Sequence, residues 1–348
     1  MNVTLRRSLL SGVSLLPAIL AGQPAPYTVQ QLAPGVHAMT RQWQPGNVAD
    51  ANVLLIINQR DVVVVDANIF PTSTRQTIAE IRKLTPNPVR YVINTHWHSD
   101  HHYGNQVYRD SFPGVEFIQH PNTRADIISR DIPALADNLA REYPAQVERF
   151  RTALRTGKTS RGETVTDSVR VAFQRGEGLY QFFIDDMGST PIVPGTLLVG
   201  DSLTLQRGER TIVIRYLGRG NTAGDLVVHL PHERIVATGD LVVLPTPFSF
   251  FSHLGDWPGT LRRLKSLDAA TIMPGHGDVQ HDWSYVDQLI PLIESTWQQV
   301  KQAVAGGADL ETTLKTVNLD QFRGNFGPNF DYLFFRPAIE AAYQEMKP

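Results

Sequence analysis

The sequence predicts an α/β domain in which helices cover layered β-sheet. Strand-like and helix-like segments alternate along the first third of the chain, and that order favours parallel strands joined by crossover helices. Several strands, such as residues 62–65, are unbroken apolar runs, which is typical of strands buried on both faces. Helical periodicity then dominates the last part of the chain, from about residue 282.

Composition narrows the function. The 348 residues are 42% hydrophobic and 19% charged, which suits one large domain with an insertion or two smaller domains. The net charge of −2 supplies no basic field for nucleic acid, which we therefore exclude as a partner. No cysteine is present, so any metal must be held by imidazole, carboxylate or carbonyl groups.

Residues 1–25 are predicted to be a signal peptide. Arg6 and Arg7 form a basic start, and residues 8–21 are an apolar run too short to span a bilayer comfortably. An uncleaved anchor or a disordered tail is the alternative. We expect the mature protein, residues 26–348, to be periplasmic or secreted, with no stable membrane association after signal removal.

The first third should contain four strands and one helix: strands at 36–39, 52–57, 62–65 and 89–94, and a helix at 73–84. Ser73 and Gln76 have the spacing of a capping box, and Pro86 follows the helix. Asp66 closes the third strand. The fourth strand leads directly into a loop rich in histidine.

A strand at 115–119 precedes a change of character. Residues 122–190 are charged and mostly helical in period, with breaks expected at Pro133 and Pro144. We interpret this stretch as an insertion that lies over the site as a lid or pocket wall. A packing element that touches no substrate is the alternative.

Strands then resume, and helices finish the chain. Strands are expected at 197–199, 202–205, 211–217, 226–230, 234–238 and 271–273, and helices at 256–267, 283–304, 310–317 and roughly 332–346.

The most informative stretch is Thr95-His96-Trp97-His98-Ser99-Asp100-His101-His102. His96 and His98 alternate and can face the same side, while Asp100 and His101 follow within one loop. Three imidazoles and a carboxylate suit zinc or a similar divalent ion, and two ions if further ligands arrive from elsewhere. A polar surface loop is the alternative.

Two later loops each offer a further ligand. Asp240 follows strand 234–238, where a buried carboxylate needs a partner or a metal. His276 lies between two glycines, which allow a close approach to an ion. Taken alone, Asp240 could be an ordinary turn aspartate and His276 an ordinary surface histidine. Together with the histidine loop they favour a metal site.

The motif His96-x-His98-x-Asp100-His101, the later Gly-Asp and the Pro-Gly-His-Gly loop resemble the metallo-β-lactamase superfamily. The likeness covers most of residues 30–280. It implies a four-layer αβ/βα sandwich: two mixed β-sheets packed face to face and flanked by helices, with a metal site at the sheet edge. The insertion at 122–190 and the C-terminal helices would be elaborations of one catalytic domain.

The resemblance also implies the ligand sets: Asp100, His101 and His276 would hold one ion, and His96 and His98 the other. Asp240 would bridge the two ions. Asp66 would match the carboxylate that braces the ligands from behind.

One position departs from the family pattern. The family's third histidine on the second ion falls where this chain has Asn221, followed by Thr222 as a supporting residue. An amide oxygen is a weaker zinc ligand than imidazole. We therefore expect one or two zinc ions, or another divalent metal, with the second site weak. His102 and His120 are spare imidazoles that could compensate or, alternatively, shape the pocket.

Such a centre favours a metal-dependent hydrolase. Two ions about 3.5–4 Å apart lower the pKa of a shared water toward neutrality, and one ion can do so alone. Asp100 would be catalytic, orienting the resulting hydroxide and carrying its proton.

The substrate is expected to be a small molecule with an amide, ester or lactone bond, β-lactams included. An aromatic stretch would line its pocket beside the metals, unless these side chains are core: Trp97, Phe248, Phe250 and Phe251. Thioesterase or sulfur dioxygenase chemistry is the alternative within this fold, and so is a non-catalytic metal- or ligand-binding member.

Overall fold

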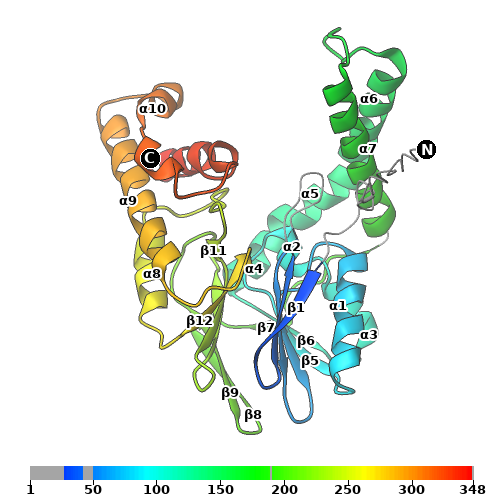
Figure 1. The fold of residues 1–348 in the computed structure, drawn as a ribbon, viewed down its shortest axis with the longest axis vertical. Helices are drawn as coiled ribbons and strands as arrows, with labels where there is room; N and C mark the ends of the chain where they lie inside the picture. The colour runs from blue at the N-terminus through cyan, green and yellow to red at the C-terminus, as the bar shows by residue number, and fades with distance from the viewer. Residues whose placement is uncertain (1–26, 42–49, 189, 347–348) are drawn as a thin grey trace, which may run out of the picture.

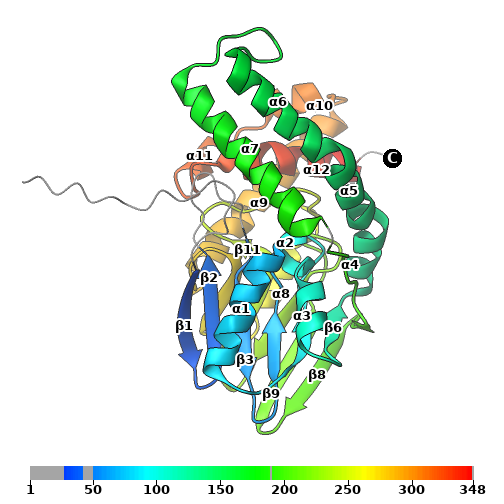
Figure 2. The ribbon, with the colours of Figure 1, turned by 90° about the vertical axis from the view of Figure 1, so that its right-hand side faces the viewer.

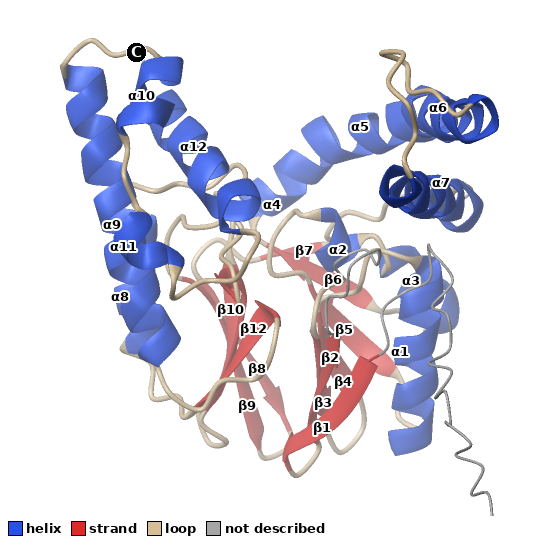
Figure 3. Cartoon of the chain, turned by 45° about the horizontal axis from the view of Figure 1, so that its top comes forward, coloured by secondary structure: helices blue, strands red, loops and turns tan. Residues whose placement is uncertain are grey.

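A computed structural model describes residues 27–41, 50–188 and 190–346, so the predicted signal peptide lies outside the described residues. Two β-sheets pack face to face and helices cover both outer faces (Figures 1 and 3). The predicted α/β sandwich of two mixed sheets flanked by helices is confirmed. Within the described part of the chain, no helix is long and apolar enough to cross a membrane.

The first sheet has seven strands in sequence order: β1 (Tyr27–Ala33), β2 (Val36–Arg41), β3 (Val53–Ile57), β4 (Val62–Val65), β5 (Val89–Ile93), β6 (Glu116–Gln119) and β7 (Leu197–Leu198). Strands β1 to β4 are antiparallel, and β4 to β7 are parallel. The crossovers carry α1 (Pro71–Leu84) and α3 (Asn105–Ser111). Both helices lie on the outer face of this sheet (Figure 1).

The second sheet has five strands in the order β12 (Thr271–His276), β11 (Ile235–Val243), β10 (Leu226–Leu230), β9 (Arg210–Tyr216) and β8 (Ser202–Arg207). Only the β11–β12 pair is parallel. Helices α8 (Trp257–Lys265) and α9 (Ser284–Ala305) cover its outer face.

Side chains on the buried strands still alternate between two cores. Leu54 and Ile56 of β3 point between the sheets, whereas Val53 and Leu55 pack toward the helices on the outer face. Because successive side chains of a strand point to opposite faces, an unbroken apolar run supplies both cores at once. This explains why the sequence shows continuous apolar strands with little visible alternation.

Residues between β6 and β7 form a helical segment that leaves the sheets and ends in a hairpin (Figure 2). Its elements are α4 (Pro121–Asp126), α5 (Ile132–Asp137), α6 (Tyr143–Thr156), α7 (Asp167–Met187) and the π-turns η1 (Ile127–Asp131) and η2 (Asn138–Glu142). The expected breaks at Pro133 and Pro144 are wrong. Each proline sits at the start of an α-segment just after a π-turn, whose wider turn accommodates the ring and the missing N–H.

Helix α1 also begins differently from the prediction. It starts at Pro71, and no side chain of its own caps it, so the expected capping box of Ser73 and Gln76 is wrong. Instead, Asp186 of α7 accepts hydrogen bonds from the Thr72 amide (2.9 Å) and hydroxyl (2.7 Å). A distant carboxylate therefore does the work of a local cap.

The chain ends in α10 (Leu310–Thr316), α11 (Asp320–Arg323), the π-turn η3 (Asp331–Phe335) and α12 (Arg336–Met346). Helix α12 packs on α9, and their apolar side chains join the core beneath the second sheet. The sequence did not predict α11, which is a single turn.

Candidate metal centre

The candidate ligands come from the ends of strands in both sheets. Strands β4 and β5 are parallel, so the residues after them, Asp66 and His96, meet at the same edge. A short helix, α2 (Ser99–His102), begins there. Across the sandwich, β11 and β12 are also parallel and bring Asp240 and His276 to that edge.

The first group of candidate ligands is His96, His98 and Asp240, whose ligand atoms all lie within 4.8 Å of one another. His96 Nε2 is 2.9 Å from His98 Nδ1 and 3.6 Å from Asp240 Oδ2. Asp240 Oδ2 is also 3.9 Å from His98 Nδ1. We call these three residues the His96 group.

The second group is Asp100, His101 and His276, again with ligand atoms within 4.8 Å of one another. Asp100 Oδ2 lies 3.0 Å from His276 Nε2 and 3.5 Å from His101 Nε2. These three residues form the His101 group. Asp100 and His101 are consecutive residues of α2, whereas His276 ends β12, far along the sequence.

Asp240 lies between the two groups. Its Oδ2 faces the His96 group, whereas its Oδ1 is 3.3 Å from His101 Nε2 and 3.6 Å from His276 Nε2. This is the arrangement that a bridging carboxylate requires, one oxygen toward each ion. The structure thus brings together six of the seven residues named as possible ligands.

A bulge in β11 aims Asp240 at this place. The sequence suggested that the strand ends before Asp240, but β11 continues to Val243, with its pairing to β12 shifted on both sides of Gly239. Gly239 has a φ of +52°, a conformation that favours glycine. A Cβ on Gly275 of β12 would collide with Asp240 Oδ1, so the carboxylate occupies space that only a glycine leaves free.

Asp66 braces His101. Its Oδ2 is 2.8 Å from His101 Nδ1, and its Oδ1 accepts the Thr95 amide at 2.8 Å. With Nδ1 held in this way, His101 turns Nε2 toward the second group. Asp66 itself adopts a positive φ of 65°, a local strain that this contact network offsets.

Other contacts hold His96 and His276. Thr95 Oγ1 lies 3.0 Å from His96 Nδ1, which leaves Nε2 for the group. Asn52, at the start of β3, donates through Nδ2 to the Pro274 and Gly277 carbonyls at 3.0 and 2.8 Å. The first sheet therefore holds the loop of the second sheet that carries His276.

The charges at the centre call for a cation. Burial keeps the pKa of His96 well below its usual value. Burial would also lower the pKa of His101, but Asp100, Asp66 and Asp240 outweigh it and raise that pKa well above normal. The clustered carboxylates are thus balanced by a proton on His101 when nothing else is bound, and a metal ion would displace that proton.

Unpaired buried atoms are a second indication that these residues can hold a metal ion. Two buried atoms that face the ligand groups have no hydrogen-bond partner among the described residues: His101 Nε2 and Asp240 Oδ1. Buried polar atoms are normally paired, and unpaired ones mark a missing ligand or ion. Imidazole and carboxylate donors without thiolate suit zinc and other divalent first-row ions.

Asn221 belongs to neither set of three. Its Nδ2 donates to the Phe248 carbonyl at 2.5 Å, and its buried Oδ1 has no partner within the described ranges. The Phe248 ring is 5.2 Å from the ring of His98, so Phe248 connects Asn221 to the His96 group. Asn221 therefore stays a predicted ligand, with an acceptor oxygen that no other described residue uses.

Thr222 makes its hydrogen bonds within its own loop and not to the candidate ligands. Its amide and hydroxyl both donate to Asp225, at 2.8 and 2.9 Å. Burial raises the pKa of Asp225 to about 7, although these two hydrogen bonds oppose the shift. Sequence reasoning missed Asp225, which fixes the loop that presents Asn221.

The spare imidazoles are engaged elsewhere. His102 is buried, and its Nε2 lies 3.0 Å from the Trp97 carbonyl and 2.8 Å from Asp131 Oδ2 of η1. Tyr103 also donates to Asp131, at 2.9 Å. His120 stacks on Tyr216 at 4.2 Å and accepts the Asn122 amide through Nδ1. Neither histidine enters a ligand group, so the suggestion that they compensate for Asn221 finds no support in their placement.

A cavity of about 870 Å³ adjoins the centre. Three of the aromatic residues expected to line a pocket do line it: Trp97, Phe250 and Phe251. Phe248 instead contacts His98, and His102 and His120 are not among the lining residues. The far walls come from α4, η1 and α12, and the contribution of α12 was not predicted.

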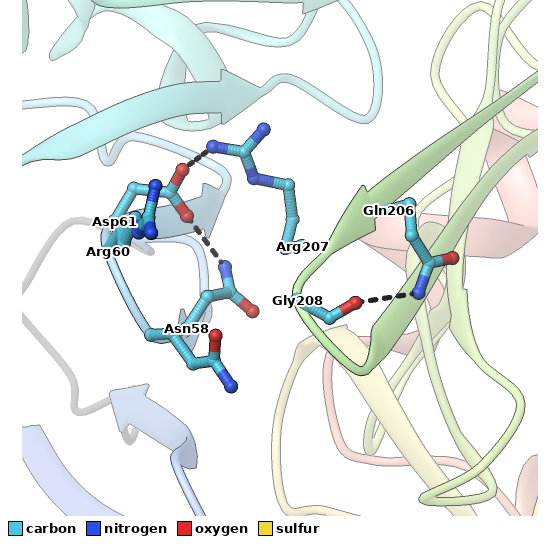
Figure 4. Close-up of a pocket in the computed structure, with 7 residues that line it drawn as sticks. Asn58, Arg60, Asp61, Gln206, Arg207 and Gly208 are labelled. Atoms are coloured by element: carbon cyan, nitrogen blue, oxygen red, sulfur yellow. Dashed lines mark hydrogen bonds and ion pairs between the residues drawn. The ribbon is translucent and has the colours of Figure 1, made fainter.

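The opposite end of the sandwich has a smaller cavity of about 360 Å³ with a different character (Figure 4). Asp61 pairs there with Arg207 and accepts Asn58 Nδ2 at 3.0 Å. These polar contacts join the β3–β4 and β8–β9 turns. No metal-ligating group of the described residues falls at this end.

Comparison with known proteins agrees with this geometry. The model of the metallo-beta-lactamase superfamily matches residues 46–276. A metallo-beta-lactamase from Pontibacter korlensis superposes with a TM-score of 0.55 at 17% identity, covering 77% of this chain and 99% of its own. The metallo-beta-lactamase FIM-1 from Pseudomonas aeruginosa, in its mono-zinc form, superposes with a TM-score of 0.52 at 16% identity. The match covers 78% of this chain and 96% of FIM-1. With the fold, the order of the motifs and the family match in agreement, this chain belongs to the metallo-β-lactamase superfamily.

Proposed function

We propose that the protein is an exported hydrolase that depends on a divalent metal, most simply zinc, and cleaves an amide, ester or lactone bond of a small organic molecule. Members of its superfamily are mostly metal-dependent hydrolases. The observation that carries the proposal is Asp240, whose two oxygens face two separate groups of ligands. When bound, the metal would supply Lewis acidity that lowers the pKa of water and polarises the scissile carbonyl.

The His101 group would hold one ion and the His96 group the other, with Asp240 shared between them. The ligand residues also orient what they hold. Asp66 and Thr95 hold His101 and His96 through their Nδ1 atoms, so that each ring turns Nε2 toward its ligand group. The centre is thereby organised before any substrate arrives.

Asp100 is the residue best placed to carry a proton. Its side chain is 14% exposed, against 3% for Asp240 and 4% for Asp66. Its Oδ2 faces His276 and His101, so it can accept a proton within the centre and pass it to solvent. We therefore assign Asp100 the general acid–base role.

Chelation and substitution test this proposal. The purified protein is assayed for metal content and against a panel of esters, lactones, β-lactams and phosphodiesters. We expect hydrolysis of at least one carbonyl substrate, lost with chelator, restored by zinc, and reduced by about 10²–10⁴-fold in Asp100→Asn. Full metal content without turnover on any panel member would contradict the hydrolase and leave a binding protein of this fold.

Asn221 bears on how many ions the centre holds. A weak amide ligand beside the His96 group can leave one ion loosely held. FIM-1 was solved in a mono-zinc form. We propose that this chain works with its tighter site alone when zinc is scarce. Export follows from the predicted signal peptide, and secretion of a full-length fusion tests it.

A further inference from the structure

The cavity beside the metal centre has no role in the chemistry described so far. It is lined by Trp97, Phe250 and Phe251, by residues of α4 and η1, and by residues of α12. Helices α4 and α12 lie close together above the sheets (Figure 3). We propose that this cavity binds the uncharged apolar body of the substrate while the bond to be cleaved lies at the metal centre. This inference rests on the proposed function and adds the class of substrate.

The aromatic rings that line the cavity lie next to the candidate ligand His98, either directly or through Phe248. The Trp97 ring lies 4.9 Å from that of His98 and 5.3 Å from that of Phe251. Phe250 lies 4.8 Å from Phe248, whose ring in turn lies 5.2 Å from His98. A substrate held on these rings would therefore place its near end beside the His96 group.

The lining favours an uncharged guest. Its three aromatic rings offer stacking surface, and the carboxylates around it are already paired: Asp126 with Arg130 (3.0 Å), Glu340 with Arg336 (2.7 Å) and Glu345 with His253 (2.8 Å). The only arginine in the lining is thus taken, and it also lies over the Trp97 ring at 5.9 Å. An anionic group buried here would face three carboxylates without a free cation.

Phe251 lines the cavity and is largely exposed. It is 59% exposed and adopts a φ of +65°, both unusual for phenylalanine. Strain and exposed apolar surface together are typical of a ligand contact rather than of a core residue. A bound apolar body would cover this ring.

Part of the wall is an addition to the common fold. Helix α12 lies beyond the matched residues 46–276. The solved neighbours named above are covered almost completely, yet they cover only 77% and 78% of this chain. The α12 side of the cavity is therefore built by residues outside the matched range.

Binding to metal-depleted protein tests the cavity without any turnover. The probes are N-phenyl-1-naphthylamine, which is uncharged, and its sulfonated relative 1-anilinonaphthalene-8-sulfonate. We expect saturable binding of the uncharged probe and at least about tenfold weaker binding of the sulfonate. No saturable binding, or equal affinity for both probes, would overturn the proposal.

Variants locate the probe. Ala341→Trp on α12 fills the cavity and should weaken the uncharged probe by about tenfold or more, whereas Ala305→Trp at the exposed end of α9 should not. If Ala341→Trp unfolds, Phe251→Ala provides the second test, because that side chain is largely exposed. Glu340→Gln should improve sulfonate binding, with Glu311→Gln on α10 as its control. Unchanged affinities in Ala341→Trp and Phe251→Ala would place the probe elsewhere and refute the assignment.

Turnover separates the two proposals. With p-nitrophenyl esters from acetate to decanoate, KM should fall as the acyl chain lengthens, and Ala341→Trp should remove that trend while Ala305→Trp keeps it. If p-nitrophenyl acetate is hydrolysed and KM does not depend on the length of the acyl chain, the cavity assignment is refuted and the hydrolase proposal stands. If the probe binds at the cavity but no ester is hydrolysed, the cavity assignment stands and hydrolysis of esters is refuted.

Discussion

The two ligand groups have the same number of members but unequal support. The His101 group is backed by Asp66, which holds His101 Nδ1 and the Thr95 amide in place. The His96 group has Thr95 behind His96, whereas His98 packs against the Trp97 and Phe248 rings, and Asn221 is held by the Phe248 carbonyl. The difference teaches that the strength of a metal site depends on what holds its ligands as much as on their count. The following changes test that asymmetry.

The largest effect is expected from Asp240→Ala, because this residue serves both groups. Removing both of its oxygens should weaken binding of every zinc equivalent by more than about 100-fold. Competition with a coloured chelator measures both equivalents in one titration. Retention of one tight equivalent would show that Asp240 belongs to a single site and would break the bridging assignment.

Asp66→Asn should weaken the His101 group more than the His96 group, because Asp66 contacts His101 directly and reaches His96 only through Thr95. An asparagine can still accept the Thr95 amide, but it no longer favours an Nδ1 proton on His101 by charge. We expect zinc at the tighter site to bind about 10–100-fold less well. The same titration checks this result, with the unfolding midpoint as the control for folding. Loss confined to the weaker equivalent would reverse the order of the two sites.

Asn221→His should strengthen the His96 group. An imidazole in place of the amide would complete a set of three nitrogen ligands, and zinc affinity at the weaker site should rise about tenfold or more. The two equivalents would then bind with similar strength. Two equally tight equivalents already in the unchanged protein would refute the asymmetry from the start.

The last change concerns the loop behind Asn221 and acts on stability rather than on metal affinity. The pKa of Asp225 is raised to about 7 by burial, so its contribution to stability is fully present below about pH 4 and is lost as the pH rises through 7. In urea unfolding of metal-depleted protein, the unchanged chain should lose up to about 4 kcal/mol relative to Asp225→Asn across that interval. Parallel pH curves would show that Asp225 is not held as described.

Sequence was most informative where the determinants are local. The strands follow from apolar runs, and the histidine loop follows directly from strand β5, so the fold class and most candidate ligands could be predicted. Strand ends meet at one edge in a layered α/β fold. This is why residues as distant as His96 and His276 could be expected to converge.

Sequence was least informative where a partner lies far along the chain. Nothing near Thr72 reveals that Asp186 will cap α1, and nothing near His102 points to Asp131. The cavity likewise needs α12 opposite η1, a packing of segments some 200 residues apart in the sequence. Such contacts depend on tertiary packing, which overrides local patterns.

The missing side chain of Gly275 has a consequence for how this molecule can vary. The Asp240 carboxylate fills the space where the methyl group of an alanine at position 275 would lie. The register of β11 against β12 therefore also sets the position of this carboxylate in the centre. A slip of one residue between these two strands would place the carboxylate on the wrong face of the sheet. Adaptation to new substrates must therefore come from the helices and loops around the centre, while this pair of strands stays fixed.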